Sequence, residues 1–111
     1  MTGEAGHTRR VGRYVRMIAR PGRGAVLADT LLRLADELRD APGCELYLVN
    51  VAADDADTVW ITEVWADQAA SDEALARDLT EVGIGDVVEL LAGPPELVAL
   101  TPLSGPGLPR N

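Results

Sequence analysis

The amino-acid sequence predicts an α+β fold of the ferredoxin-like type, with the element order β-α-β-β-α-β. Four segments have the apolar content or alternation of strands, two longer segments repeat apolar residues at helical spacing, and a short loop separates the second strand from the third. A four-stranded antiparallel sheet with helices on one face accommodates this order. The 111 residues suffice for one such domain with a modest core.

The first strand is expected over residues 11–20 and is ended by the Pro-Gly-Arg-Gly sequence at residues 21–24. Successive side chains of a strand point to opposite faces of the sheet. One face would carry Val11, Arg13, Val15, Met17 and Ala19, and the other Tyr14, Arg16, Ile18 and Arg20.

A helix is expected to follow and to run to about residue 40. Its core side is a stripe of leucines at spacings of four, three and four residues: Leu27, Leu31, Leu34 and Leu38. The Ala-Pro-Gly sequence at residues 41–43 would end this helix, because proline and glycine are common just past a helix C-terminus.

An antiparallel hairpin is expected next, from a strand over residues 44–52, an acidic turn over residues 53–57 and a strand over residues 58–66. By strand alternation, Glu63 and Trp65 share one face of the third strand and Trp60 lies on the other. The second strand would place Cys44, Leu46, Leu48 and Asn50 on one face, and Glu45, Tyr47, Val49 and Val51 on the other. The acidic turn lacks the ligand spacing of an EF-hand and is expected to be solvated.

The remaining elements are a second helix over residues 67–79, a short helix over residues 86–92 and a fourth strand over residues 96–103. Asp67 is a plausible N-cap of the second helix, whose thin apolar stripe would be Ala70, Ala74 or Leu75, and Leu79. Residues 1–10 and 104–111 are expected to be flexible tails that flank a single domain of residues 11–103.

The predicted sheet is apolar on both faces, although helices would cover only one. Tyr14 and Ile18 lie on the second face of the first strand, and the two hairpin strands are apolar on both sides. A sheet with one face in water should alternate cleanly. The second face therefore needs a cover, and a copy of the same sheet is the simplest one, so the sequence predicts a homodimer with a barrel of two sheets.

Composition excludes several classes of function. The net charge is −8, and residues 24–109 hold Arg33, Arg39 and Arg77 against seventeen acids. Such a body repels nucleic-acid phosphates and anionic lipid, so neither a nucleic acid nor a membrane is an expected partner. Cys44 is the single cysteine, which excludes an internal disulfide and a cysteine-based zinc site. With no signal peptide and no spanning segment, a cytoplasmic protein is expected.

The hairpin carries a family resemblance. The sequence "APGCELYLVN", an acidic turn and "VWITEVWADQAASDEAL" together resemble the antibiotic biosynthesis monooxygenase superfamily, which has a "PGC" turn before strand two and a Glu-x-Trp motif at the end of strand three. The resemblance covers about residues 11–101. It implies a dimeric ferredoxin-like barrel that oxygenates anthrones, quinols or related polyketide aromatics. It also implies molecular oxygen as co-substrate and no flavin or metal.

The resemblance assigns Trp65 to the pocket, as a stacking wall with an indole N–H for a substrate oxygen. Glu63 is either a base or a structural carboxylate paired with an arginine such as Arg16 across the dimer, and the second reading is favoured because buried acids are usually paired. Further candidates for binding a small aromatic substrate are Arg16, for an anionic group, and Tyr14, Tyr47, Asn50 and Ile61.

The chain also departs from the superfamily. Ala74 stands where the helix after strand three usually has a histidine, and Ile61 stands where the anthrone-oxygenating branch has an asparagine. The first strand has no asparagine and the single histidine is His7, so haem degradation is not expected. Two alternatives to an oxygenase stay open on the same scaffold: a polyketide cyclase or isomerase, and a non-catalytic dimeric ligand-binding protein.

Overall fold

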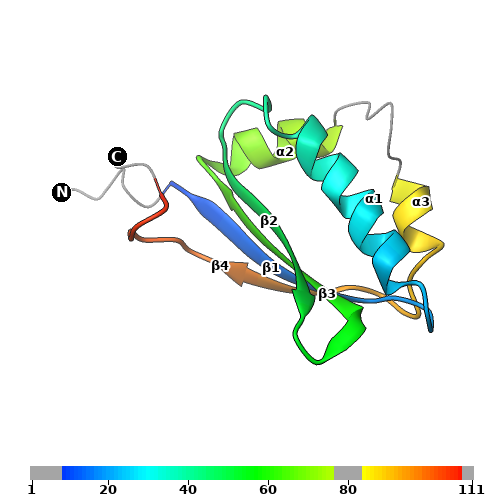
Figure 1. Ribbon diagram of the computed structural model, residues 1–111. Helices are drawn as coiled ribbons and strands as arrows, with labels where there is room; N and C mark the ends of the chain where they lie inside the picture. Colours follow the sequence, from blue (N-terminus) through cyan, green and yellow to red (C-terminus); the bar gives the residue numbers. More distant parts are fainter. Residues whose placement is uncertain (1–8, 77–83, 109–111) are drawn as a thin grey trace.

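The computed structural model describes residues 9–76 and 84–108 and confirms the α+β ferredoxin-like fold (Figure 1). The elements are β1 (Val11–Ile18), α1 (Gly24–Glu37), β2 (Cys44–Ala52), β3 (Asp55–Trp65), α2 (Gln68–Ala76), α3 (Ile84–Val88) and β4 (Glu96–Leu100). The four strands form one antiparallel sheet in the order β2-β3-β1-β4. No helix in the described part of the chain is long and apolar enough to cross a membrane.

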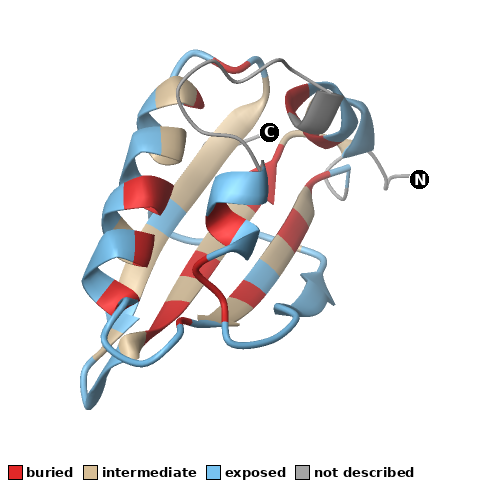
Figure 2. Ribbon diagram, turned by 90° about the vertical axis from the view of Figure 1, so that its right-hand side faces the viewer, coloured by how far each residue is buried: buried red, intermediate tan, exposed pale blue. Residues whose placement is uncertain are grey.

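The helices lie on one face of the sheet, called here the inner face, and the opposite face is called the outer face (Figure 1). Three leucines of the predicted stripe, Leu27, Leu31 and Leu38, are at most 5% exposed, as the helical spacing predicts. Figure 2 shows the buried residues of α1 on its sheet-facing side. The main core joins α1, α3 and the strands β1 and β3 through Val15, Ala19, Leu27, Leu31, Val59, Ile61, Val87, Leu90 and Leu91.

The start of α1 is fixed by the acidic stretch that was expected to be a solvated turn. Ala52 pairs with Asp55, so the turn shrinks to residues 53–54 and Asp57 belongs to β3. The Asp57 carboxylate accepts hydrogen bonds from the backbone N–H groups of Gly22, at 3.0 Å, and Gly24, at 2.9 Å. A carboxylate at a helix N-terminus satisfies unpaired donors and complements the helix dipole. The prediction of a solvated turn over residues 53–57 is therefore wrong for Asp57.

The Pro-Gly-Cys turn joins α1 to the sheet under the start of α2. Gly43 has φ +79°, and a Cβ at this position would lie 2.5 Å from the Cβ of Ala70. The Gly43 carbonyl accepts from the N–H of Ala66 at 2.7 Å, and Asp67 caps α2 by accepting from the N–H of Ala70 at 2.8 Å, as predicted. Only glycine provides both the left-handed backbone and this close approach.

A bulge at the start of β2 corrects one predicted face. Cys44 pairs with Trp65 and Leu46 pairs with Val64, so Glu45 is the extra residue between them. Cys44 therefore packs on the inner face near Trp65, and not on the face of Leu46 and Leu48 as strict alternation predicts.

Other predicted bounds differ from the structure as well. β1 ends at Ile18, and the short helix α3 ends at Val88. The chain leaves the helix there because residues 90–92 bond to the segment at the end of β1. The Arg20 N–H donates to the Leu90 carbonyl, and the Ala92 N–H donates to the Ile18 carbonyl. β4 ends at Leu100, two residues before Pro102, which has no N–H and packs against Gly12. Residues 77–79 of the predicted second helix lie outside the described residues, as do residues 1–8 and 109–111 of the predicted tails.

Candidate functional site

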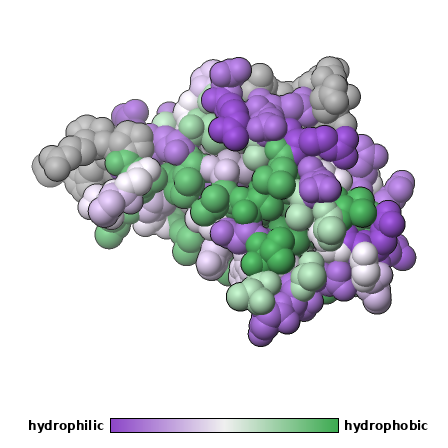
Figure 3. All heavy atoms as spheres, viewed as in Figure 1, coloured by the Kyte–Doolittle hydropathy of each residue, from purple (hydrophilic) through white to green (hydrophobic). Residues whose placement is uncertain are grey.

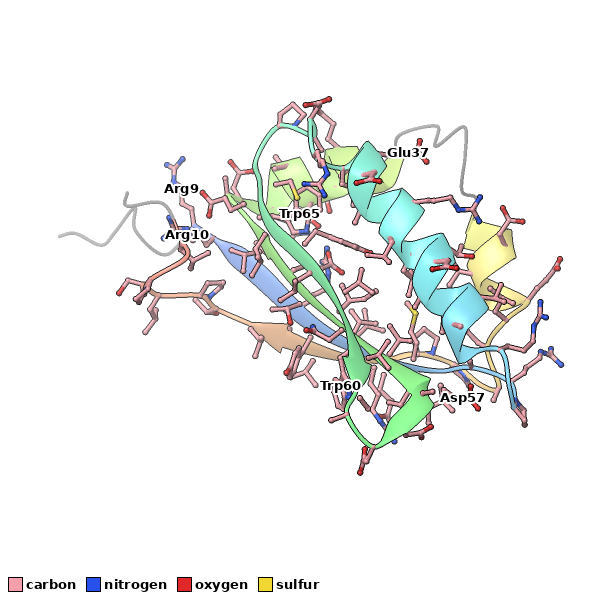
Figure 4. All side chains as sticks on the ribbon, viewed as in Figure 1. Arg9, Arg10, Glu37, Asp57, Trp60 and Trp65 are labelled. Carbon is pink, nitrogen blue, oxygen red and sulfur yellow. The ribbon has the colours of Figure 1, made fainter. Side chains whose placement is uncertain are left out.

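The structure divides the seven predicted site residues between the two faces of the sheet. Trp65, Glu63, Tyr47 and Ile61 lie on the inner face, where Tyr47 is the cross-strand partner of Glu63. Tyr14, Arg16 and Asn50 lie on the outer face with Trp60, which pairs with both Arg16 and Asn50. One pocket in a single chain therefore cannot contain all seven. In Figure 4, Trp65 and Trp60 lie toward opposite ends of the hairpin.

On the inner face, Trp65, Glu63 and Arg13 form one hydrogen-bonded unit. The Trp65 indole N–H donates to Glu63 Oε1 at 2.9 Å, and Arg13 Nη2 donates to the same oxygen at 3.1 Å. Trp65 is 2% exposed, and the Arg13 and Glu63 side chains are 18% and 12% exposed. Arg13 also donates to the hydroxyl of Ser71, which is fully buried, so the unit connects β1, β3 and α2.

This geometry corrects two expectations about Glu63 and Trp65. Glu63 is paired with an arginine, but that arginine is Arg13, because Arg16 points to the outer face and pairs with Glu96 at 2.8 Å. The indole N–H of Trp65, expected to meet a substrate oxygen, donates to Glu63 instead. The Trp65 ring is thereby fixed in orientation as a wall between the sheet and the helices.

The sequence prediction did not single out Arg13 or Ser71 as site residues. Arg13 did carry a signal, since it stands among Val11, Val15 and Met17 on the core-facing side of the first strand. A charged residue on such a face is rarely buried without a partner. Ser71 carried no comparable signal, because serine in a surface helix is ordinary.

Tyr47 is a part-buried phenol on the inner face. It packs against both core clusters, and burial raises the pKa of its hydroxyl well above the ordinary value near 10. The negative charge of Glu63 raises this pKa further, and so does the charge that Cys44 acquires at alkaline pH, while Arg13 lowers it. The phenol therefore keeps its proton at neutral pH and can donate to an anionic oxygen.

Burial and the Glu63 charge likewise raise the pKa of the Cys44 thiol, against a smaller lowering by a backbone hydrogen bond from Leu46. A protonated, part-buried thiol is a packing residue rather than a nucleophile.

A pocket of about 250 Å³ opens between the end of α1 and β2, and Tyr47 reaches it. Leu38 and Cys44 form part of its wall, and Arg39 and Glu45 are its charged members. A larger hollow of about 550 Å³ lies on α1 itself, between side chains of that one helix from Val26 to Asp36, away from the Trp65 unit. Within the described residues, no three His, Cys, Asp or Glu side chains gather as metal ligands.

The outer face holds a second aromatic group and a large apolar surface. The rings of Tyr14 and Trp60 are 5.2 Å apart between centroids, and the Arg16 guanidinium lies 5.8 Å from the centre of the Trp60 ring. Asn50 donates to the carbonyl of Trp60 at 3.3 Å across the hairpin. Figure 3 shows apolar side chains gathered over β2 and toward β4. The exposed apolar residues of the outer face include Tyr14, Ile18, Leu48, Val98 and Leu100, each more than 40% exposed.

Comparison with known proteins identifies the family. The family model described as antibiotic biosynthesis monooxygenase matches residues 10–80, which contain the Trp65 unit and the hairpin. Among curated proteins, no sequence matches significantly.

Several solved structures share the fold. A protein of Chloroflexus aurantiacus J-10-fl, named for the same family, is 29% identical and superposes with a TM-score of 0.75, covering 90% of this chain and 99% of that one. Rv0793 of Mycobacterium tuberculosis is 25% identical with a TM-score of 0.75, covering 87% of this chain and 98% of that one. A Caulobacter crescentus CB15 protein, 18% identical with a TM-score of 0.79 and covering 88% and 93%, supports the fold alone.

Proposed function

The chain belongs to the antibiotic biosynthesis monooxygenase family, and from this premise we propose that it is a monooxygenase that needs neither flavin nor metal. Its substrate would be an electron-rich aromatic of the anthrone or quinol type, as in polyketide secondary metabolism, and its place of action the cytoplasm. The observation that carries this proposal is the inner-face unit of Trp65, Glu63 and Arg13 beside the protonated Tyr47.

The chemistry needs a substrate anion and a dry site. Loss of a proton from an anthrone or quinol gives an anion that can pass an electron to O₂ directly. For an anthrone, the CH₂ group becomes a carbonyl, one oxygen atom of O₂ enters the product and the other leaves as water, so the substrate supplies all the electrons. The protein has to orient a flat molecule, stabilise the anion and exclude water.

The inner-face residues supply these three functions. Trp65 is 2% exposed, so a planar ring would stack against it only after a neighbouring side chain moves aside. Tyr47 donates its hydroxyl hydrogen to the substrate oxygen on which the negative charge develops. Ile61, 1% exposed, keeps the floor of the site apolar, and Glu63 holds the Trp65 ring in place.

The outer face is proposed as the surface of a homodimer. It exposes a band of apolar side chains with Trp60 and Tyr14 at its centre, which a monomer in water rarely leaves uncovered. Arg16, Asn50 and Tyr14, first considered for substrate, would then contact the partner sheet and not a substrate on the inner face.

The test measures O₂ consumption by the purified protein with a panel of anthrones and hydroquinones. We expect protein-dependent uptake that falls about tenfold or more in Trp65→Phe, since ring size and the Glu63 hydrogen bond both change. The matched control is Trp60→Phe on the outer face, expected to stay within about twofold. Conversion of the same substrates under strict exclusion of O₂ would select the cyclase or isomerase instead, and tight binding without any product would select the non-catalytic binding protein.

A further inference from the structure

We propose that the pocket between the end of α1 and β2 binds a flat aromatic molecule that carries a carboxylate, and that Arg39 selects for this anion. The inference names a substrate feature for the proposed function, and rests on that function only in calling the bound molecule a substrate. The pocket has a volume of about 250 Å³, and Tyr47 reaches it. Figure 1 shows the C-terminal end of α1 and the start of β2 at the same end of the fold.

The wall of this pocket is mostly apolar and aromatic. Its uncharged members are Ala35 and Leu38 from the end of α1 and Cys44, Leu46 and Tyr47 from β2. Small-molecule sites usually combine such a wall with a few polar groups that fix the orientation of the ligand. The volume is below the roughly 300–1,000 Å³ of sites that enclose a whole ligand, so the pocket holds one end of a flat molecule.

The same wall borders the buried cluster around Trp65. Leu38 belongs to this cluster, and Cys44 and Tyr47 pack against it. Cys44 is also the cross-strand partner of Trp65, and Tyr47 is that of Glu63. A ring in the pocket is therefore separated from Trp65 by side chains that contact both, and it lies against the phenol that the proposed function uses as a donor.

Glu45 lines the pocket, but its charge is already met by an arginine. The Nε–H of Arg10 donates to Glu45 Oε1, and the two side chains are only 3% and 16% exposed. Separating a pair that lies this far from water would leave an uncompensated charge in the protein, so the pair stays together. Glu45 therefore does not prevent an anion from binding at this pocket.

Arg39 is the charged group that a ligand can recruit. Its Nε–H donates to Asp36 Oδ1 at 2.8 Å, but the Arg39 and Asp36 side chains are 76% and 68% exposed. Exposed ion pairs contribute little to stability, so a ligand carboxylate can replace Asp36 easily. Among the described residues, no side chain accepts from the other two nitrogens of the guanidinium. Arginine binds carboxylates through two parallel N–H bonds of this kind.

The rest of the protein disfavours an anion, so a local cation has to select it. Residues 24–109 hold three arginines against seventeen acids. Among the described residues of this range, the arginines are Arg33 and Arg39, and Arg33 lines the separate hollow on α1. Arg39 is therefore the arginine at this pocket, and Arg33 is a control of the same charge on the same side of the sheet.

The experiment compares the binding of 2-naphthoate and 2-naphthamide to the purified protein by equilibrium dialysis at low ionic strength. The two compounds have the same rings and differ in charge, and neither has a quinol or anthrone group that reacts with O₂. We expect the wild-type protein to bind the carboxylate about tenfold more tightly than the amide, and Arg39→Gln to bind the two equally. The matched control, Arg33→Gln, removes the same charge from α1 and should retain the preference.

A second variant tests whether the rings occupy the pocket. Ala35→Leu adds a larger side chain to the helix wall of the pocket and should weaken the binding of both compounds by about tenfold or more. Leucine is a good helix former, so we expect the variant to fold, and urea unfolding checks this for each variant.

Three results would overturn the inference: equal affinities in the wild-type protein, an undiminished preference in folded Arg39→Gln, or unchanged binding in folded Ala35→Leu. Failure of both compounds to bind would overturn it as well. A preference that depends on Arg39, without O₂ uptake from any anthrone or hydroquinone, would keep the inference and remove the oxygenase proposal. Protein-dependent O₂ uptake together with equal affinities would do the reverse.

Discussion

The two faces of the sheet carry nearly the same set of side chains in two very different environments. The inner face joins Arg13, Glu63 and Trp65, and the outer face joins Arg16, Glu96 and Trp60. On the inner face the arginine and glutamate side chains are 18% and 12% exposed, whereas on the outer face they are 37% and 67% exposed.

This contrast teaches that burial, more than residue type, separates a candidate site from a surface. On the inner face, the Arg13 guanidinium and the Trp65 indole N–H donate to the same oxygen of Glu63, and Arg13 also donates to Ser71. These hydrogen bonds hold the group between β1, β3 and α2. On the outer face, the arginine lies above the tryptophan ring and its ion pair is open to water, where such pairs contribute little to stability. The outer group is instead surrounded by exposed apolar residues, as expected of a surface that meets a partner.

The largest expected effect on stability comes from breaking the Arg13–Glu63 ion pair of the inner face. Arg13→Ala leaves the Glu63 carboxylate and the buried Ser71 hydroxyl without their donor, and should lower the free energy of unfolding by about 3 kcal/mol. Arg16→Ala, the matched change on the outer face, should cost less than about 1 kcal/mol. Urea denaturation of both variants at two protein concentrations measures the difference, and equal losses would contradict the contrast between the faces.

A second prediction tests the outer face as a dimer surface. Leu48→Asp places a charge within the exposed apolar band and should weaken self-association by at least about tenfold, or 1.4 kcal/mol. Leu32→Asp is the matched control, because Leu32 is 50% exposed on α1 and Leu48 is 49% exposed on β2. Light scattering after size-exclusion chromatography reports the mass. A wild-type protein that has the mass of one chain at all concentrations would argue against the dimer.

The smallest expected effect concerns pH and the inner-face Tyr47. Its folded-state pKa is raised above the unfolded value, so its contribution to stability is complete below about pH 10 and is lost progressively from that pH up to the raised folded-state pKa. At pH 11 the loss should reach about 1.4 kcal/mol relative to pH 8.

Tyr47→Phe should remove this part of the alkaline destabilisation, whereas Tyr14→Phe, the matched change on the outer face, should keep it. The measurement is the difference in unfolding free energy between pH 8 and pH 11 for the three proteins. The same alkaline loss in Tyr47→Phe as in the wild type would show that another group is responsible.

Much of the fold was predictable because it depends on local periodicity. The leucine stripe of α1, the opposite orientations of Trp60 and Trp65, and the Asp67 cap of α2 follow from helical spacing, strand alternation and short-range capping. The errors occur where distant segments meet. Asp57 was assigned to a solvated turn because the backbone donors of Gly22 and Gly24 are more than thirty positions away in the chain.

The candidate site shows the same limit. The Glu-x-Trp motif pointed to Glu63 and Trp65, and the structural reading of Glu63 offered an arginine such as Arg16 of the dimer partner, whereas Glu63 pairs with Arg13 of its own chain. Both arginines lie on β1 and both are plausible by charge. The antiparallel register, which pairs Arg13 with Glu63 and Arg16 with Trp60, decides between them.

Local patterning of the chain was enough to determine the α+β class, the order of its elements and, apart from Cys44 at the start of β2, which residues of each strand share a face, because these properties follow from repeats of two and 3.6 residues. Tertiary structure alone decided that Arg13 and Ser71 join Trp65, that Cys44 turns inward at a bulge, and that a carboxylate oxygen of Glu37 is buried without a partner. The physical reason is that hydrogen bonds and desolvation depend on which distant groups come within about 3 Å of one another, and that is fixed only when the sheet register and the helix packing are in place.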